Sequence, residues 1–181
     1  MNRSIRILHD IDLENAFTNK NICDISSIKQ KLEDNYKEEW LQKIEQKPKL
    51  RFYKTFKHSL QSEKYVSSNI SRAERSFLAQ FRFGILPIHV ETGRFNRTPL
   101  EERTCAICGK AEIEDEEHFL LKCSKYKNTR NNLFNKCRQK EPNFENLNNS
   151  DKIQIMMTSM VNQSARYIKE AYNIRFNTIN K

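Results

Sequence analysis

Three cysteines and one histidine lie close together in the sequence, in the pattern Cys105-x2-Cys108-x9-His118-x4-Cys123. Two cysteines two residues apart can form a tight turn that directs both sulfur atoms at one point. Gly109 follows them, and glycine lets the backbone turn without a Cβ clash. Three thiolates and one imidazole make the closed tetrahedral ligand set of a structural zinc site. Because no coordination position stays open for water, hydrolytic zinc chemistry is disfavoured, and we expect one structural Zn²⁺ per chain.

Other roles for these cysteines fit the sequence less well. Lone cysteines are commonly small buried hydrophobic residues, but four ligand-type side chains within nineteen positions are hard to assign to that role. A disulfide framework is typical of secreted chains, and the cysteine count here is five, an odd number. A Cys-x2-Cys redox site is expected near a βαβ pattern, which the surrounding sequence lacks. Cys137 falls on the apolar stripe of a predicted helix, so we expect it in the core and not at the metal.

Two predicted helices must position the second pair of ligands. Residues 115–121 can form a short helix whose acidic first turn is favoured by the helix dipole. His118 and Cys123 would diverge by about 140° on a continuous α-helix, so this helix should break before Cys123. A second helix should follow and run to about Lys140. Arg130 falls on its apolar side, where a buried guanidinium needs a carboxylate partner, and the acidic metal loop can supply one.

Charge is distributed unevenly along the chain. The 181 residues carry a net charge of +9, and the low Gly and Pro counts, three and four, favour long helices over a turn-rich β fold. Residues 42–97 hold twelve Lys/Arg against four Asp/Glu, and residues 124–140 hold six against none. Residues 104–123 hold two against five. Two basic blocks therefore flank an acidic metal loop, and such blocks suit contacts with phosphate groups. The alternative for any single lysine is an ordinary solvated helix surface.

Four segments are predicted along the chain. Residues 1–47 form an N-terminal helical arm whose apolar side chains recur every four positions, a stripe expected to pack in the core. Residues 48–140 form a basic helical region with a zinc knuckle at 104–123 and a helix after it. Residues 141–150 form a polar linker, and residues 151–181 form a C-terminal amphipathic helix that packs on the rest. The predicted fold is mainly α-helical and clamped by one structural Cys3His zinc knuckle.

The basic region contains stretches of differing clarity. Ser71 and Glu74 form a capping box, which predicts a helix that Gly84 ends. The apolar residues of segment 50–60 fit both the alternation of a strand and the spacing of a helix, and we interpret the segment as a helix. It interleaves basic and aromatic residues, a mixture suited to base stacking and phosphate contact, although an amphipathic core helix explains it equally well. Gly93 predicts a loop that leads into the knuckle.

Several runs of residues carry a resemblance to a known family. They are Arg75-x-x-Leu-Ala-Gln-Phe-Arg-Phe-Gly84, Glu91-Thr-Gly-Arg94, the Cys-x2-Cys pair, Glu114-Asp-Glu-Glu-His-Phe-Leu-Leu121, Cys123, Tyr126, Arg130 and Ala165-Arg-Tyr-Ile-x-x-Ala171. Together they resemble the region downstream of the polymerase in non-LTR (LINE-type) retrotransposon proteins. In that region an arginine-rich helix precedes a cysteine–histidine zinc knuckle and another helix. The likeness spans roughly residues 50–175.

The resemblance implies a zinc-binding accessory module of a reverse transcriptase that binds nucleic acid. It also implies that the metal ligands are Cys105, Cys108, His118 and Cys123. The sequence contains no Tyr-x-Asp-Asp polymerase core, and no endonuclease domain is evident. On this interpretation the chain is an orphaned or truncated C-terminal segment of such a protein.

The predicted function is non-specific electrostatic binding of RNA or DNA by the basic helices. The predicted contacts are Arg72, Arg75, Arg82, Arg94, Arg97, Lys125 and Lys127. The alternative is a structural or protein-interaction module whose zinc only stabilises the fold, or a non-functional retroelement fragment. The acidic metal loop favours this alternative, since it would repel phosphate. No catalytic constellation stands out, so we do not expect an enzyme. With no signal-peptide run and no candidate membrane span, we expect an intracellular protein, nuclear or cytoplasmic, without a membrane partner.

Overall fold

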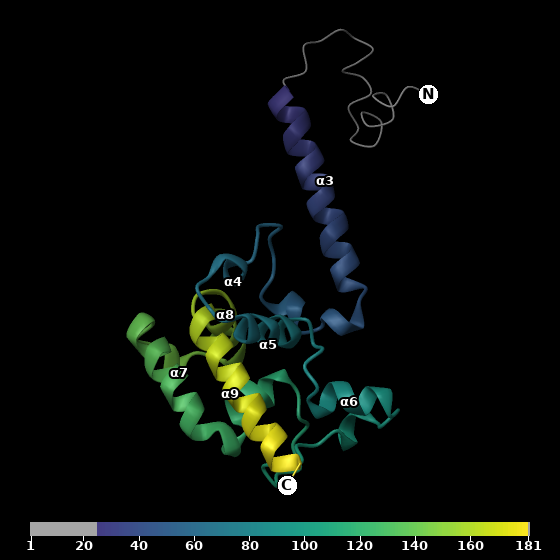
Figure 1. Ribbon diagram of the computed structural model, residues 1–181. Helices are drawn as coiled ribbons and strands as arrows, with labels where there is room; N and C mark the ends of the chain where they lie inside the picture. Colours follow the sequence, from purple (N-terminus) through teal and green to yellow (C-terminus); the bar gives the residue numbers. More distant parts are fainter. Residues whose placement is uncertain (1–24, 181) are drawn as a thin grey trace. The chain divides into compact units, whose positions relative to one another are not determined.

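A computed structural model describes residues 25–180, and their regular structure is helical (Figure 1). These residues include no β-strand and one isolated antiparallel bridge. The prediction of a mainly α-helical fold with a Cys3His cluster is thus confirmed. None of the described helices is long and apolar enough to cross a membrane. Residues 1–24 of the predicted N-terminal arm lie outside the described part of the chain.

The described residues divide into two compact units, one formed by residues 25–47 with 58–60 and the other by residues 48–57 with 61–180. The second unit contains α4 (Lys64–Ser67), α5 (Arg72–Arg82), α6 (His89–Phe95), α7 (Lys127–Lys140), α8 (Asn149–Thr158) and α9 (Val161–Ile179). Short 3₁₀ turns lie at Pro48–Leu50, Tyr53–Thr55, Leu100–Glu102, Ser124–Tyr126 and Phe144–Asn146, and a π-helical turn lies at His118–Lys122.

The first unit is built on α3, Ile25–Glu45. The predicted helix is present, but its apolar stripe is not core along its whole length. Ile44 is buried, whereas Leu32 and Tyr36 are 40% and 61% exposed. Besides α3 and the residues that link it to Pro48, the described part of this unit contains only residues 58–60. That is too little apolar surface to bury so long a stripe.

The segment 50–60, which we call the aromatic segment, is not the helix that we predicted. It forms two 3₁₀ turns instead, and Phe52, Tyr53 and Phe56 are buried. The Phe52 ring packs edge-on against Phe56 and against Phe81 of α5, each at 5.2 Å between centroids. The three rings therefore serve the core, which removes them as stacking platforms for nucleic-acid bases.

Helix α5 follows the sequence prediction closely. The Ser71 side chain accepts a hydrogen bond from the backbone N–H of Glu74, and the Glu74 carboxylate accepts one from the backbone N–H of Ser71. The helix ends just before Gly84, which has a φ of +64° that favours glycine. Leu78 and Phe81 on its inner face are fully buried. Local capping and apolar spacing thus determine this helix.

Gly93 lies inside α6 and not in the loop that we predicted. A Cβ atom at this position would come within 2.7 Å of Cγ of Arg103. The Arg103 guanidinium donates hydrogen bonds to the backbone carbonyls of Thr98 and Val90. A larger residue here would force the Arg103 side chain to move, so this glycine reflects close packing from another segment. A sequence pattern does not distinguish such a glycine from one in a turn.

The C-terminal part contains two helices where we predicted one. Helices α8 and α9 are separated by Ser159 and Met160, and the Asn148 side chain caps α8 by accepting from the backbone N–H of Asp151. The predicted linker also contributes to the core, because Phe144 is fully buried within it. Helix α9 packs against α5, α7 and α8, so it is the central element of the second unit.

Candidate metal centre

A short antiparallel pairing positions the first two cysteines. Thr104 and Ile113 form the bridge, and the backbone N–H of Cys105 donates to the carbonyl of Glu112 at 2.9 Å. A turn closes the pairing, and Gly109 in it adopts a φ of +70°. This pairing places the two sulfur-bearing residues at the closed end of the loop. We call residues 104–123 the knuckle.

A π-helical turn brings the other two ligands together. We predicted an α-helix that breaks before Cys123, because five residues span about 1.4 turns of an α-helix. Instead the backbone N–H of Cys123 donates to the carbonyl of His118 at 2.8 Å, a bond that spans five residues. Such a bond brings a residue close to the one five positions before it, and π turns are often found at functional sites. The Asp115 carboxylate fixes the start of the turn by accepting from the backbone N–H of His118 at 2.7 Å.

The four ligand-type atoms converge on one point. All lie within 4.8 Å of one another, with 3.9 Å between the sulfurs of Cys105 and Cys123 and 3.6 Å between the Cys108 sulfur and Nε2 of His118. Tetrahedral zinc with Zn–S bonds of about 2.3 Å separates two sulfurs by about 3.8 Å. Cys105, His118 and Cys123 are buried. The cluster can therefore hold a metal ion without rearrangement of the backbone.

Hydrogen bonds among the ligand-type groups shift the pKa values of Cys105, Cys123 and His118. The hydrogen bond with Cys123, together with burial, raises the pKa of Cys105 to about 12, although backbone N–H groups of Ile107 and Cys108 act the other way. The same thiol–thiol bond lowers the pKa of Cys123. Burial lowers the pKa of His118, but hydrogen bonds with Cys105 and Cys108 outweigh it and raise the value to about 9. A bound cation would displace the protons of these groups, so metal affinity should weaken as the pH falls.

A carboxylate outside the ligand set orients the histidine. An oxygen of Glu112 lies 2.9 Å from Nδ1 of His118. A proton on Nδ1 satisfies this contact and leaves the lone pair of Nε2 directed at the cluster. Carboxylates that hold ligand histidines in this way are a common feature of metal sites.

The other acidic residues of the knuckle are paired as well. Both oxygens of Glu114 accept from the Arg175 guanidinium of α9, at 2.7 and 2.8 Å, and one also accepts from the backbone N–H of His89. Glu117 pairs with Lys122 at 2.6 Å, which lowers the pKa of Glu117. The acidic run therefore holds the knuckle to its surroundings.

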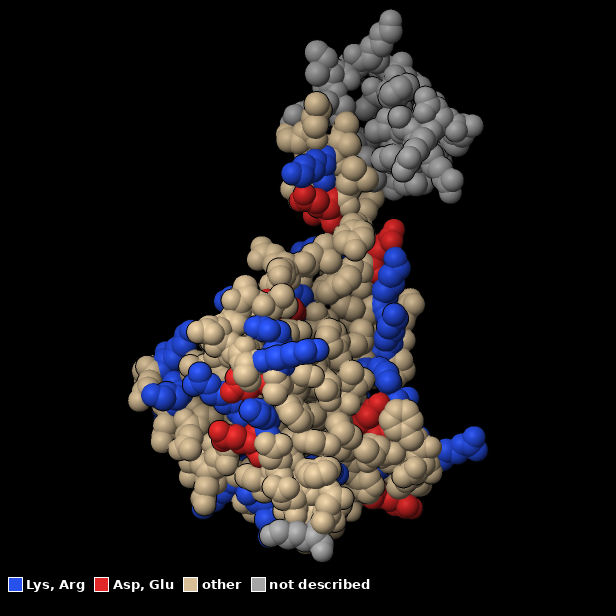
Figure 2. Space-filling model, viewed as in Figure 1, with Lys and Arg blue, Asp and Glu red and all other residues tan. Residues whose placement is uncertain are grey.

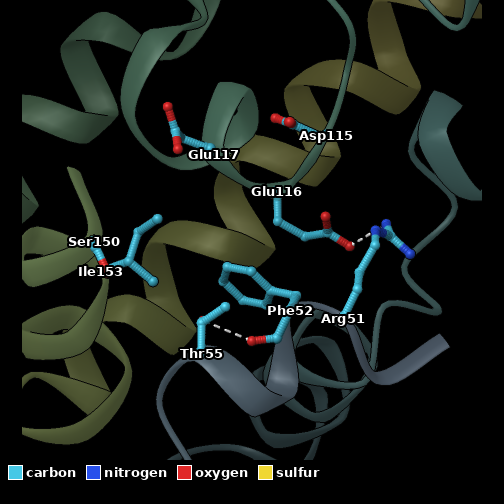
Figure 3. Close-up of a pocket in the computed structure, with 8 residues that line it drawn as sticks. All are labelled: Arg51, Phe52, Thr55, Asp115, Glu116, Glu117, Ser150 and Ile153. Carbon is cyan, nitrogen blue, oxygen red and sulfur yellow. Dashed lines mark hydrogen bonds and ion pairs between the residues drawn. The ribbon is translucent and has the colours of Figure 1, made fainter. Parts of the chain in front are cut away.

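Glu116 points into a pocket of about 260 Å³ and pairs with Arg51 at 2.7 Å (Figure 3). Phe52 and Ile153 form apolar walls of the same pocket. Burial raises the pKa of Glu116, while the Arg51 guanidinium opposes this effect. This pair ties the knuckle to the aromatic segment in the same way that Glu114 ties it to α9.

Arg130 is buried as predicted, but its partner is different. Its guanidinium donates to the backbone carbonyl of Cys123 at 2.9 Å and not to a carboxylate. The carboxylates of the knuckle already have other partners. A carbonyl at the end of the π turn has no partner within that turn, so the arginine stabilises the position of a ligand.

The predicted nucleic-acid contacts divide into two groups. The predicted contact at Arg82 is wrong, because this side chain is 1% exposed. Its guanidinium donates to Glu63 and to the carbonyl of Met157, at 2.5 Å each, and lies 4.4 Å from the Phe56 ring centroid. Arg75 donates to the carbonyls of Tyr65, Ser68 and Ile70, and Arg94 pairs with Glu91. Four residues remain exposed without an ion pair to any described residue: Arg72, Arg97, Lys125 and Lys127.

Sequence reasoning missed Glu112, Glu114 and Arg175. A carboxylate six positions before a ligand histidine was a usable signal, since carboxylates that hydrogen-bond a ligand histidine are common. The Glu114–Arg175 pair joins residues 61 positions apart, and no local pattern reveals such a contact.

No family model, curated protein or solved structure matches the chain.

Proposed function

We propose that the chain is a zinc-stapled helical module that binds RNA or DNA through positive charge, without reading sequence. The resemblance to the region downstream of the polymerase in non-LTR retrotransposon proteins supports the same function. The metal would hold the knuckle together, and the helix that follows the knuckle would contact the nucleic acid.

The donor set supports zinc as the metal. Three sulfurs and one imidazole nitrogen in a closed, mostly buried cluster suit Zn²⁺, whereas Mg²⁺ and Ca²⁺ prefer oxygen ligands. Elemental analysis of the full chain, purified without chelator, should give one zinc per chain. A different metal, present at one ion per chain, would contradict the assignment of zinc. A Cys108→Ser variant should lose the ion.

The observation that carries the nucleic-acid proposal is the composition and exposure of α7 and the turn before it. Lys127–Lys140 contains no acidic residue, and Lys125, Lys127 and Lys136 are exposed and form no ion pair with any described residue. Blue side chains line the edge of the molecule where α7 lies (Figure 2). Exposed amides accompany these lysines: Asn128, Asn131, Asn132, Asn135 and Gln139. Such a face offers charge to phosphates and hydrogen bonds to sugars and bases.

The acidic residues of the knuckle should repel phosphate less than the sequence indicates. Its five carboxylates make contacts with cations, with His118 or with a backbone N–H. A paired carboxylate repels a phosphate much less than a free one does.

A salt titration tests this proposal. Fluorescence anisotropy of a labelled single strand should give an affinity that falls with salt, with a slope of about −0.7 per phosphate neutralised. Reversal of Lys125, Lys127 and Lys136 to Glu should abolish binding without changing zinc content. The matched control reverses three lysines of α3, namely Lys29, Lys31 and Lys37, and gives the same net charge.

The control separates a binding surface from a charge effect. If both triple variants lose affinity equally, attraction is a property of net charge and the α7 face is not the site. If wild type and the α7 variant give the same curves, the nucleic-acid proposal is wrong and the structural or protein-interaction module remains.

A further inference from the structure

A groove of about 180 Å³ lies between α7 and α9, two helices that pack side by side (Figure 1). Its floor is apolar, because Leu133 and Tyr167 are 3% and 2% exposed. Its rim is polar and comes from both helices: Thr129, Asn132, Lys136, Gln163, Arg166 and Glu170. Drug-sized ligand pockets occupy about 300–1,000 Å³, so this groove suits one flat group and not a large ligand.

The two cations on the rim are available to a ligand. Lys136 is exposed and makes no ion pair with any described residue. Arg166 is 63% exposed, and the carboxylate recorded beside it, Glu74, lies 3.8 Å away, which is too far for a hydrogen bond. The Glu74 carboxylate is already engaged in the capping box of α5. Glu170 is the one acidic group among the residues that line the groove.

Two amides, one from each helix, line the groove and form no hydrogen bond with any described residue. They are Asn132 on α7 and Gln163 on α9. Each amide carries donors and an acceptor, so together they can match the mixed donor and acceptor edge of a base. The Watson–Crick edge of a base is such a mixed edge, and it is accessible only when the base is unpaired, because pairing occupies it in a duplex.

We propose that this groove receives one unpaired nucleobase, and that the protein therefore prefers single-stranded nucleic acid to duplex. This inference rests on the proposed function. The base edge contacts Asn132 and Gln163, the Arg166 guanidinium stacks on the base face, and Lys136 contacts a neighbouring phosphate. Guanidinium stacking on splayed bases is an established mode of single-strand recognition.

Charge alone predicts the opposite preference, which makes the inference testable. A duplex carries one negative charge per about 1.7 Å of axis, a higher density than a single strand carries. A surface that binds by attraction only should therefore bind the duplex at least as tightly.

The test compares a labelled single strand with the duplex of the same sequence, titrated with the zinc-loaded full chain at physiological salt. We expect the single strand to bind about tenfold more tightly, because only the single strand can place a base in the groove. The double variant Asn132→Ala with Gln163→Ala leaves the net charge unchanged and should remove that preference. Its control, Asn173→Ala with Asn177→Ala, changes two exposed α9 amides that do not line the groove and should keep the preference.

The outcomes distinguish this inference from the proposed function. Equal affinity for both forms, or an unchanged preference in the groove variant, overturns the groove while salt-dependent binding through α7 stands. Absence of any binding overturns both. Circular dichroism melting of each variant checks that the fold is intact, and Arg166→Ala gives a second route to the same loss if the amide variant unfolds.

Discussion

The knuckle and α7 are neighbours in sequence but use their charges in opposite ways. The knuckle carries five carboxylates, and all of them contact a cation, His118 or a backbone N–H. Helix α7 and the turn before it carry lysines that contact no described carboxylate, while Arg138 pairs with Glu145. Charge in the knuckle therefore maintains structure, and charge on α7 is available to a partner. A charge run in a sequence does not reveal which of these two uses applies.

Loss of Glu114 should have the largest effect on stability. The Glu114→Ala variant leaves Arg175 without its partner in a mostly buried position, which costs about 3–5 kcal/mol in the free energy of unfolding. Chemical denaturation of the zinc-loaded protein measures this change. Glu101→Ala, which removes an exposed carboxylate, serves as the control and should unfold like wild type. Similar curves for the two variants would place Glu114 among the free surface charges and break the comparison.

Helix α5 also contains both a buried, paired arginine and an exposed one, and this contrast gives the second prediction. Arg82→Ala removes a buried guanidinium that donates to Glu63 and to the carbonyl of Met157, so the free energy of unfolding should fall by about 3 kcal/mol. Glu63 keeps its ion pair with Lys57 at 3.1 Å. Arg72→Ala, at the exposed start of the same helix, should change it by less than about 0.5 kcal/mol. Thermal melts of both variants check this. An unchanged melting temperature for Arg82→Ala would return that residue to the phosphate contacts.

Glu112 should affect the metal more than the fold. The Glu112→Gln variant weakens the contact that orients His118, so metal affinity should fall by about tenfold. Competition with a chromophoric chelator measures the affinity, and the melting temperature at saturating zinc should stay close to that of wild type. Glu117→Gln alters a carboxylate of the same run that contacts no ligand. If both variants release zinc equally, Glu112 has no orienting role.

Substitution of a single lysine on α7 should give the smallest effect, a change in the salt dependence of binding without a change in stability. Lys127→Ala should reduce the slope of log affinity against log salt by about 0.7, the share of one phosphate on a single strand. Its free energy of unfolding should change by less than about 0.5 kcal/mol, because the side chain is exposed. A change in stability without a change in slope would reverse the roles that we assign to the two regions.

Local signals in the sequence predict the local parts of this molecule. The capping box at Ser71 and the Cys-x2-Cys turn near Gly109 depend on neighbours within a few residues, and the structure contains both. The convergence of the four ligand-type residues follows from their spacing and side-chain chemistry. The π turn at His118–Lys122 was not predicted, because an α-helical period is the usual assumption.

The remaining errors concern partners that are distant in sequence. Arg82 has the spacing of an exposed residue on an amphipathic helix, yet its partners are Glu63 and the carbonyl of Met157. Arg130 was expected to need a carboxylate and is satisfied by a carbonyl. The aromatic segment was interpreted as a helix because two periods fit it. In each case tertiary contacts decide the outcome, and a single sequence does not specify them.

Thermal unfolding of the full chain with and without a strong chelator tests the central claim most directly. If the Cys3His cluster binds a structural metal, chelation should remove it and lower the melting temperature steeply, because metal binding and folding of the knuckle are coupled. Added Zn²⁺ should restore the original transition. An identical melting temperature in chelator, with no metal detected in the folded protein, would contradict the account.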